Sequence, residues 1–160
     1  STLLGSCVAA CVYDPERGVG GMNHFMLPDG LADSGTPARY GVHAMELLIN
    51  EVMKLGGDRR SLRAKAFGAA SVLNLGGEQN VAARNAQFIR EFLRAEGIPL
   101  VSERLGGNQA LMVKLQTHDG RVMLKALGGE VASSAARADT QFLESLRHEA
   151  DEARTSITLF

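Results

Sequence analysis

The sequence predicts an α+β fold, a layered α/β sandwich in which two main helices cover a mixed, mostly antiparallel sheet. Three observations lead to this prediction. Short apolar runs bounded by turn residues indicate strands, two longer segments carry apolar residues at helical spacing, and the elements follow the order β-β-α-β-α-β-β-β. Because hairpins need antiparallel neighbours, this order argues against a purely parallel, doubly wound sheet. A length of 160 residues, 45% of them hydrophobic and 22% charged, suits one globular domain.

The first two expected strands form a hairpin. Residues Cys7–Tyr13 are interpreted as a buried strand and Val19–Leu27 as its partner, which Pro28-Asp29-Gly30 stops. The segment Asp14–Gly18 between them has turn chemistry, because its proline fixes φ and its glycine permits a positive φ.

Two helices and four further strands are expected after the hairpin. Thr36 is expected to cap a first helix that runs from about Pro37 to Leu55. Asn80, or a residue near it, is expected to cap a second helix, which ends at Gly97. The apolar stripe of the second helix is interpreted as core. The turn His118-Asp119-Gly120 is a strong hairpin signal between the last two strands. The four strands are expected at Arg63–Phe67, Ile98–Leu105, Ala110–Thr117 and Arg121–Leu127.

The composition changes after Gly128-Gly129. Residues from about Ala132 to Arg154 are rich in Ala, Glu and Arg and carry few large apolar side chains, which indicates a marginal helix or a mobile tail. We therefore expect a single folded domain over residues 1–130 and a polar C-terminal helix or tail over residues 131–160.

Composition and charge argue against several function classes. The net charge is −1 and the basic residues are scattered, so binding to nucleic acid or to acidic lipid is not expected. The chain has no apolar run of about 18 residues and no signal-peptide pattern, so membrane insertion is not expected either. It has no initial Met and begins inside an expected element, so we expect it to be part of a longer protein. Scattered histidines and glycine clusters without a phosphate-loop pattern predict no metal and no cofactor.

The two cysteines, Cys7 and Cys11, are expected to be free thiols. On an extended segment they lie about 13 Å apart, from a rise of ~3.3 Å per residue. A disulfide needs Cα atoms within roughly 7 Å. Free thiols favour a reducing compartment.

Cys7 and His24 could form a catalytic pair. If the turn is centred within Asp14–Arg17, the numbers of paired residues sum to 31, and Cys7 lies directly across from His24 on one face. A neighbouring imidazolium lowers the pKa of a thiol from its usual value of about 8.5 and can later protonate a leaving amine. The small residues Gly5 and Ser6 would let backbone N–H groups near Cys7 bind an oxyanion. A one-residue slip in register would separate the two side chains onto opposite faces.

Structural interpretations of the same residues stay open at this point. A cysteine flanked by small residues on a buried strand is more often a packing residue, and Cys11 keeps that interpretation. A histidine in an apolar strand is more often a hydrogen-bonded core residue. The residues alone therefore leave both a catalytic pair and a purely structural role for Cys7 and His24.

Two segments form a specific signature: Ser-Thr-Leu-Leu-Gly-Ser-Cys-Val-Ala-Ala-Cys-Val-Tyr-Asp over residues 1–14 and Gly-Gly-Met-Asn-His-Phe-Met-Leu-Pro over residues 20–28. This signature resembles that of the chemoreceptor glutamine deamidases, the CheD family. The likeness continues more weakly through residues 39–50 and 64–70 and reaches the hairpin near Leu127.

The resemblance implies a cytoplasmic, cysteine-dependent amidohydrolase with a layered α/β sandwich fold. Such an enzyme hydrolyses glutamine side chains of methyl-accepting chemotaxis receptors to glutamates, without metal or cofactor, and binds a CheC-type phosphatase. The family's nucleophile matches Cys7 and its histidine matches His24. Its third catalytic residue, a Thr or Ser six residues before the cysteine, falls on Ser1, and the adjacent Thr2 is the alternative.

Two rival interpretations have different consequences for Cys7. In the first, the chain is a non-catalytic or weakly active binding module that engages a chemotaxis phosphatase or receptor. In the second, it is a structural domain in which both cysteines are packing residues. A thiol that reacts below neutral pH would favour catalysis, whereas slow labelling would favour the rivals.

Overall fold

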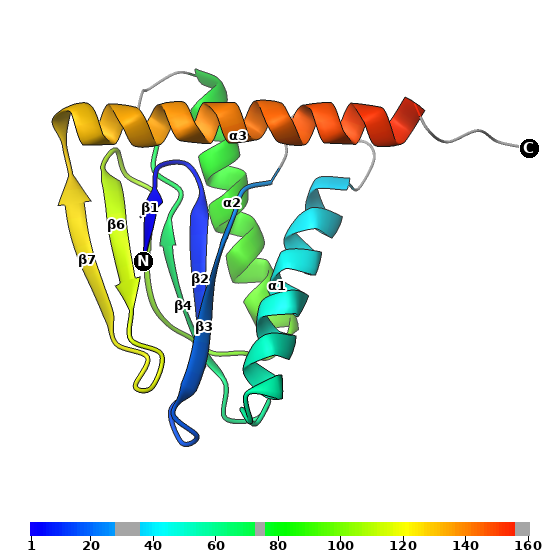
Figure 1. Cartoon of the computed structure of the whole chain (residues 1–160), viewed down its shortest axis with the longest axis vertical. Coiled ribbons are helices and arrows are strands. Elements are labelled where there is room, and N and C mark those ends of the chain that lie inside the picture. The colour runs from blue at the N-terminus through cyan, green and yellow to red at the C-terminus, as the bar shows by residue number, and fades with distance from the viewer. Residues whose placement is uncertain (28–35, 73–75, 156–160) are drawn as a thin grey trace, which may run out of the picture.

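The structure is a computed structural model that describes residues 1–27, 36–72 and 76–155; within these ranges, the side chains of residues 36–38, 76–80, 135–136, 143 and 146–155 are not described. The expected stop at Pro28-Asp29-Gly30 and the Thr36 cap therefore fall on residues or side chains outside the description. The elements follow the chain (Figure 1) as β1 (Thr2–Leu4), β2 (Val8–Asp14), β3 (Val19–Phe25), α1 (Thr36–Lys54), β4 (Arg63–Gly68), α2 (Gly76–Ala95), β5 (Leu100–Leu105), β6 (Ala110–Leu115), β7 (Val122–Leu127) and α3 (Gly129–Thr155).

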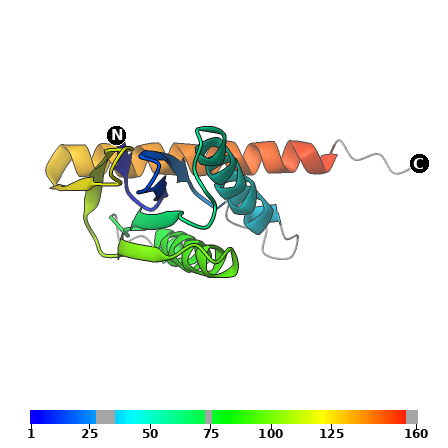
Figure 2. The same ribbon diagram turned by 90° about the horizontal axis from the view of Figure 1, so that it is seen from below.

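The strands form two sheets that pack against each other. One has the order β3-β2-β4-β5 and the other the order β1-β6-β7. The β4–β5 pair is parallel and the other pairs are antiparallel. Helices α1 and α2 lie on the side of the four-stranded sheet away from β6 and β7 (Figure 2). The predicted layered α+β class with a mixed, mostly antiparallel arrangement is confirmed, but the prediction did not divide the strands into two sheets.

Strand β2 is the centre of this sandwich and is buried along its whole length. Its even-numbered apolar residues, Val8, Ala10 and Val12, pack in the core under the helices. The odd-numbered residues, including Cys7 just before the strand and Cys11 within it, pack toward the three-stranded sheet. This alternation follows from the period-two geometry of a strand, and it puts Cys7 between two layers rather than on the outer surface.

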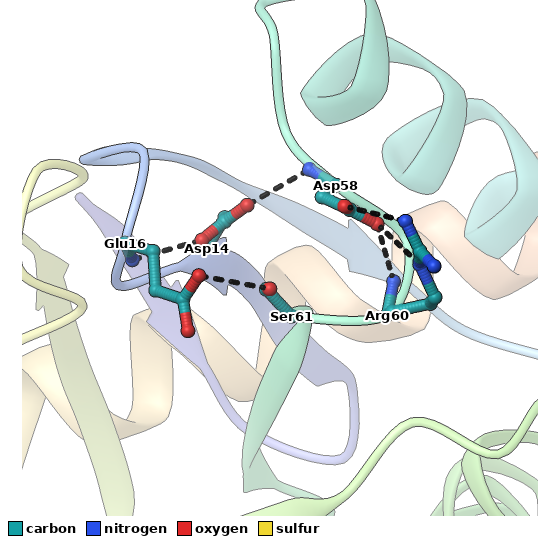
Figure 3. Close-up of polar contacts among 5 residues, drawn as sticks. All are labelled: Asp14, Glu16, Asp58, Arg60 and Ser61. Carbon is teal, nitrogen blue, oxygen red and sulfur yellow. Dashed lines mark hydrogen bonds and ion pairs between the residues drawn. The ribbon is translucent and has the colours of Figure 1, made fainter.

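The turn after β2 is held by the carboxylate of Asp14 (Figure 3). It accepts hydrogen bonds from the backbone N–H groups of Glu16 at 2.9 Å, Arg17 at 3.1 Å and Asp58 at 2.8 Å. These N–H groups hold the pKa of Asp14 below its ordinary value, and the hydrogen bond from Asp58 has the largest effect. The turn ends at Gly18, whose φ of 66° is the positive value expected of a turn glycine.

This turn sets a register that differs from the predicted one. The observed loop is residues 15–18, and Ala9, not Cys7, lies directly across from His24. The numbers of paired residues sum to 33, as in the pair Val8 and Phe25. The prediction of a sum of 31 is wrong because the loop is centred one residue later. Since this moves the pairing by two residues, the parity is kept and His24 still shares a face with Cys7.

The first element was not expected, whereas the last takes the helical one of the two forms expected for the C-terminal segment. Residues Thr2–Leu4 form a short strand that was not predicted and that pairs with β6, with Leu3 opposite Met112. The C-terminal segment is a helix of 27 residues, α3, which crosses the strand ends at the top of Figure 1. Asn80 lies inside α2 rather than at its cap, because that helix begins at Gly76. In the part of the chain that is described, no helix combines the length and the hydropathy needed to cross a membrane.

Candidate active site

The loop of Gly5, Ser6 and Cys7, between β1 and β2, is fixed through its carbonyl groups. All three carbonyl oxygens accept hydrogen bonds from other parts of the chain. The donors to Gly5, Ser6 and Cys7 are the Ala70 N–H at 2.8 Å, Asn85 Nδ2 at 2.9 Å and the Ala69 N–H at 2.7 Å. With its three carbonyl groups held in this way, the loop directs the Ser6 N–H toward the carboxylate of Asp139.

The segment after β4 is shaped to hold this loop. Gly68 has a φ of 107°, and a Cβ atom there would collide with the carbonyl oxygen of Cys7. Ala69 has a φ of 53°, a left-handed conformation that is unusual for a residue with a side chain. Such strain persists where surrounding contacts enforce it, here the hydrogen bond from the Ala69 N–H to Cys7. Glycine is therefore required at position 68 for the backbone to approach Cys7 so closely.

Asn85 is a positioning residue that the sequence interpretation missed. Its side chain is completely buried in α2, where Nδ2 donates to the Ser6 carbonyl and Oδ1 accepts the Leu27 N–H at 2.8 Å. It thus links the Cys7 loop to the chain that follows β3. A signal was present: Asn85 lies four residues from both Val81 and Ile89, on the apolar stripe of the helix, where a buried amide needs partners.

Cys7 and His24 come together at the same end of the β2–β3 pair. The sulfur of Cys7, a ring nitrogen of His24 and a carboxylate oxygen of Asp139 all lie within 4.8 Å of one another. The thiol is buried, with 1% of the residue exposed, whereas His24 keeps an exposed edge. A nucleophile and a base are therefore close together, with access from one side.

A hydroxyl group holds the other side of the imidazole. Thr2 Oγ1, on strand β1, lies 2.8 Å from His24 Nδ1. When Nδ1 carries the proton and donates it to Thr2, Nε2 is left as the acceptor on the far side of the ring. The structure gives this contact to Thr2, the alternative considered above, and Ser1 is exposed beside it.

Asp139, from the middle of α3, reaches into the same place. Its Oδ2 accepts hydrogen bonds from the Ser6 N–H at 2.6 Å and from Ser6 Oγ at 3.0 Å. Its Oδ1 accepts one from Cys7 Sγ at 3.0 Å. A carboxylate 132 residues away from the cysteine therefore binds both the thiol and the backbone N–H beside it. No local pattern in the sequence predicts this contact.

These surroundings set the protonation of the thiols. Burial, and then the charge and hydrogen bond of Asp139, raise the pKa of the Cys7 thiol far above its ordinary value. Burial of the ring lowers the pKa of His24, and the charge of Asp139 opposes this. The pKa of Cys11 is raised to about 12 by burial. Both cysteines are free, as predicted, and the contact with Asp139 favours the protonated form of the Cys7 thiol.

A pocket lies between α3 and the sheets at this point. Its volume is about 370 Å³, and it is lined by Leu3, Cys7, His24, Ala138, Asp139 and Phe142. The lining is mainly apolar around a few polar groups, which is typical of ligand sites. The thiol, imidazole and carboxylate are also ligand types that Zn²⁺ binds, and this group was not found from the sequence because Asp139 was assigned to a polar tail.

The structure thus brings together most of the residues singled out in the sequence. Cys7 and His24 share the pocket, and the Ser6 N–H donates to Asp139, which also lines it. Gly5 contributes space, because a Cβ atom there would lie 2.5 Å from Asp139 Oδ2. Cys11 is a core residue, as expected.

Comparison with known proteins adds a family to this geometry. Residues 26–126 match the family model described as CheD chemotactic sensory transduction. A probable chemoreceptor glutamine deamidase CheD of Bordetella petrii is 51% identical over 129 residues, which cover 79% of this chain and 58% of that protein. A protein of the same description from Burkholderia vietnamiensis is 46% identical over 163 residues, which cover 99% of this chain and 66% of the relative. One from Thiobacillus denitrificans is 52% identical over 130 residues, which cover 79% of this chain and 64% of the relative. The chain thus spans 58 to 66% of the length of these relatives.

Proposed function

The chain belongs to the CheD family of chemotactic sensory transduction proteins, and on this premise we propose that it is a protein-glutamine deamidase with Cys7 as its nucleophile. The substrates are glutamine side chains of chemotaxis receptors, which are hydrolysed to glutamates. The relatives that it resembles are described as probable chemoreceptor glutamine deamidases. The observation that carries the proposal is the convergence of a thiol, an imidazole and a directed backbone N–H in one pocket.

In the first step, His24 takes the proton of Cys7 and the thiolate attacks the carboxamide carbon of the substrate. A C–S bond forms, and the carbonyl oxygen becomes an oxyanion. The Ser6 N–H, which in the structure donates to the carboxylate of Asp139, binds this oxyanion, and Gly5 leaves the space for it. The collapse of this intermediate breaks the C–N bond, and the imidazolium of His24 supplies the proton with which ammonia leaves.

In the second step, His24 activates a water molecule that hydrolyses the thioester. The products are a glutamate side chain and the free thiol, so neither a metal nor a cofactor takes part. Thr2 positions the imidazole throughout, because its hydroxyl lies 2.8 Å from Nδ1 and leaves Nε2 as the nitrogen that accepts the proton. Thr2 is our assignment for the third residue of the site, in preference to Ser1.

The test is ammonia release from a glutamine-bearing cytoplasmic fragment of a chemoreceptor. Cys7→Ala is expected to abolish it, and His24→Ala to lower it by about 10²- to 10⁴-fold, the contribution of general acid–base catalysis. Cys11→Ala is the matched control, because Cys11 is an equally buried thiol in the same strand system but outside the pocket. Ammonia release by Cys7→Ala at the unsubstituted rate would end the proposal.

A second comparison separates the two candidates for the third residue. Thr2→Val keeps the shape of the side chain but removes the hydroxyl, and it is expected to slow turnover by about 2- to 12-fold, the worth of one ordinary hydrogen bond. Ser1→Ala is expected to have a smaller effect, since Ser1 is exposed. The reverse order would assign the role to Ser1.

One observation favours the rival function of a binding module. With Asp139 in place, the pKa of Cys7 is raised, which opposes thiolate formation. A chain that never released Asp139 would engage a receptor or a CheC-type phosphatase without turning over glutamine. We propose a CheC-type phosphatase as a partner and the cytoplasm as location in either case, and the ammonia assay decides between enzyme and module.

A further inference from the structure

Helix α3 is attached to the rest of the molecule in an unusual way. Among its described side chains, Asp139 is the one that is buried, with 7% of the residue exposed. The larger apolar side chains among those described in this helix, Val131 and Phe142, remain 48% and 37% exposed. A surface helix is normally held by an apolar stripe that faces the core. The described part of α3 is instead anchored by a carboxylate that occupies the candidate active site.

The position of this carboxylate matches that of the product in the proposed reaction. After thioester hydrolysis, a new carboxylate lies beside the Cys7 thiol, with one oxygen still at the oxyanion donor. Asp139 has this arrangement: its Oδ1 accepts a hydrogen bond from Cys7 Sγ at 3.0 Å, and its Oδ2 accepts one from the Ser6 N–H at 2.6 Å. The fit depends on Gly5, since a Cβ atom there would lie 2.5 Å from Oδ2.

The neighbours of Asp139 complete the likeness to a bound segment. Ala138 and Phe142 line the same pocket, and Phe142 lies three residues beyond Asp139, on the same helical face. The pocket therefore receives one polar side chain and one aromatic side chain from a helix. The junction with β7 is open, because Cβ atoms at Gly128 and Gly129 would meet no atom within 4 Å. The two glycines at the start of α3 are thus not packed closely against other atoms.

We propose that α3 is a built-in, product-like ligand that closes the active site and has to withdraw Asp139 before a substrate can enter. This proposal rests on the proposed function, since the term product refers to the deamidation reaction. It makes the structure the resting form of the protein. In this form the thiol donates a hydrogen bond to Asp139 Oδ1, and the Ser6 N–H donates one to Asp139 Oδ2. Neither the nucleophile nor the oxyanion donor is therefore available to a substrate.

The experiment measures how fast iodoacetamide alkylates Cys7 in the whole chain. Every protein tested carries Cys11→Ala, so that Cys7 is the thiol whose alkylation is measured. Asp139→Ala removes all three hydrogen bonds of the anchor, and Glu144→Gln is the matched control because it removes an exposed charge from the same helix. Since a hydrogen bond to a charged group changes an equilibrium by about tenfold or more, Asp139→Ala is expected to alkylate at least about tenfold faster. An unchanged or slower rate would overturn the proposal.

A second variant opens the contact from the opposite side. Gly5→Ala places a methyl group against Asp139 Oδ2 and is expected to speed alkylation as well, while α3 keeps its own sequence. If Asp139→Ala does not fold, judged by circular dichroism, the Gly5→Ala result decides. Faster alkylation in Gly5→Ala supports the proposal, and a rate equal to that of the unsubstituted chain refutes it.

Ammonia release from the receptor fragment, measured in parallel with Asp139→Ala, separates this proposal from the proposed function. Faster alkylation together with faster ammonia release supports both. Faster alkylation without ammonia from any variant refutes the deamidase and leaves α3 as a cover of Cys7. Ammonia release by the unsubstituted chain without faster alkylation in either variant refutes the cover and leaves the deamidase.

Discussion

Replacing Asn85 by alanine removes a side chain that links the Cys7 loop to the chain that follows β3. Two buried backbone groups lose their partners, the Ser6 carbonyl at 2.9 Å and the Leu27 N–H at 2.8 Å. Each unsatisfied buried group costs about 1–3 kcal/mol, so the sum is about 2–6 kcal/mol before water enters the space. We expect the free energy of unfolding to fall by about 3 kcal/mol, because a water molecule can replace part of the hydrogen bonding that the amide provides to these two backbone groups.

Urea denaturation followed by circular dichroism measures this change. With a slope of about 2 kcal/mol per molar urea, the midpoint is expected to fall by about 1–2 M. Asn108→Ala is the control, since it removes an exposed amide and is expected to change stability by no more than about 0.5 kcal/mol. A loss below about 1 kcal/mol for Asn85→Ala would refute the reasoning, because it would mean that the two backbone groups do not depend on the amide.

Three further outcomes follow from the structure. Asp14→Asn is expected to destabilise the protein at neutral pH but not in acid. The folded-state pKa of Asp14 is lowered, so the stabilisation by its carboxylate is present above the unfolded pKa of about 3.9 and is lost as the pH falls through the folded value. Urea midpoints measured at several pH values would reveal this dependence. Gly68→Ala is expected to cost about 1–3 kcal/mol by strain at positive φ, besides displacing the Cys7 carbonyl, and normal stability would contradict this. Dialysis against a chelator is expected to leave ammonia release unchanged, and added Zn²⁺ to inhibit it by binding Cys7 and His24; loss of activity in chelator would contradict the metal-free mechanism.

Much of the fold could be predicted because its signals are local. Hairpin turns, glycine stops and helical stripes gave β2, β3, α1, β6 and β7 to within about two residues of their observed ends. The short strand β1 was missed because three residues carry no recognisable period, and its pairing with β6 joins positions more than 100 residues apart. The division into a domain over residues 1–130 and a tail over 131–160 stays a prediction.

The site could be predicted only in part, for a similar reason. Cys7 and His24 were paired through the parity of a hairpin, and this inference survived a register error because the error was two residues. Asp139 and Asn85 come from helices, and helix packing over long sequence separations leaves no local pattern. A polar residue on the apolar stripe marks Asn85 in retrospect, whereas nothing in the sequence around Asp139 distinguishes it from an ordinary solvated residue.

The contrast between β2 and α3 has a consequence for hydrogen exchange. Strand β2 is buried on both faces and hydrogen-bonded on both edges, so its amide protons are expected to exchange only when the whole molecule unfolds. Helix α3, held in its described part by one buried side chain, can open by itself at a far smaller free-energy cost. The reactive sulfur thus adjoins a strand whose amide protons exchange slowly, while the helix that covers it is expected to exchange faster. How often Cys7 is exposed is therefore expected to depend on local opening of α3 rather than on global stability.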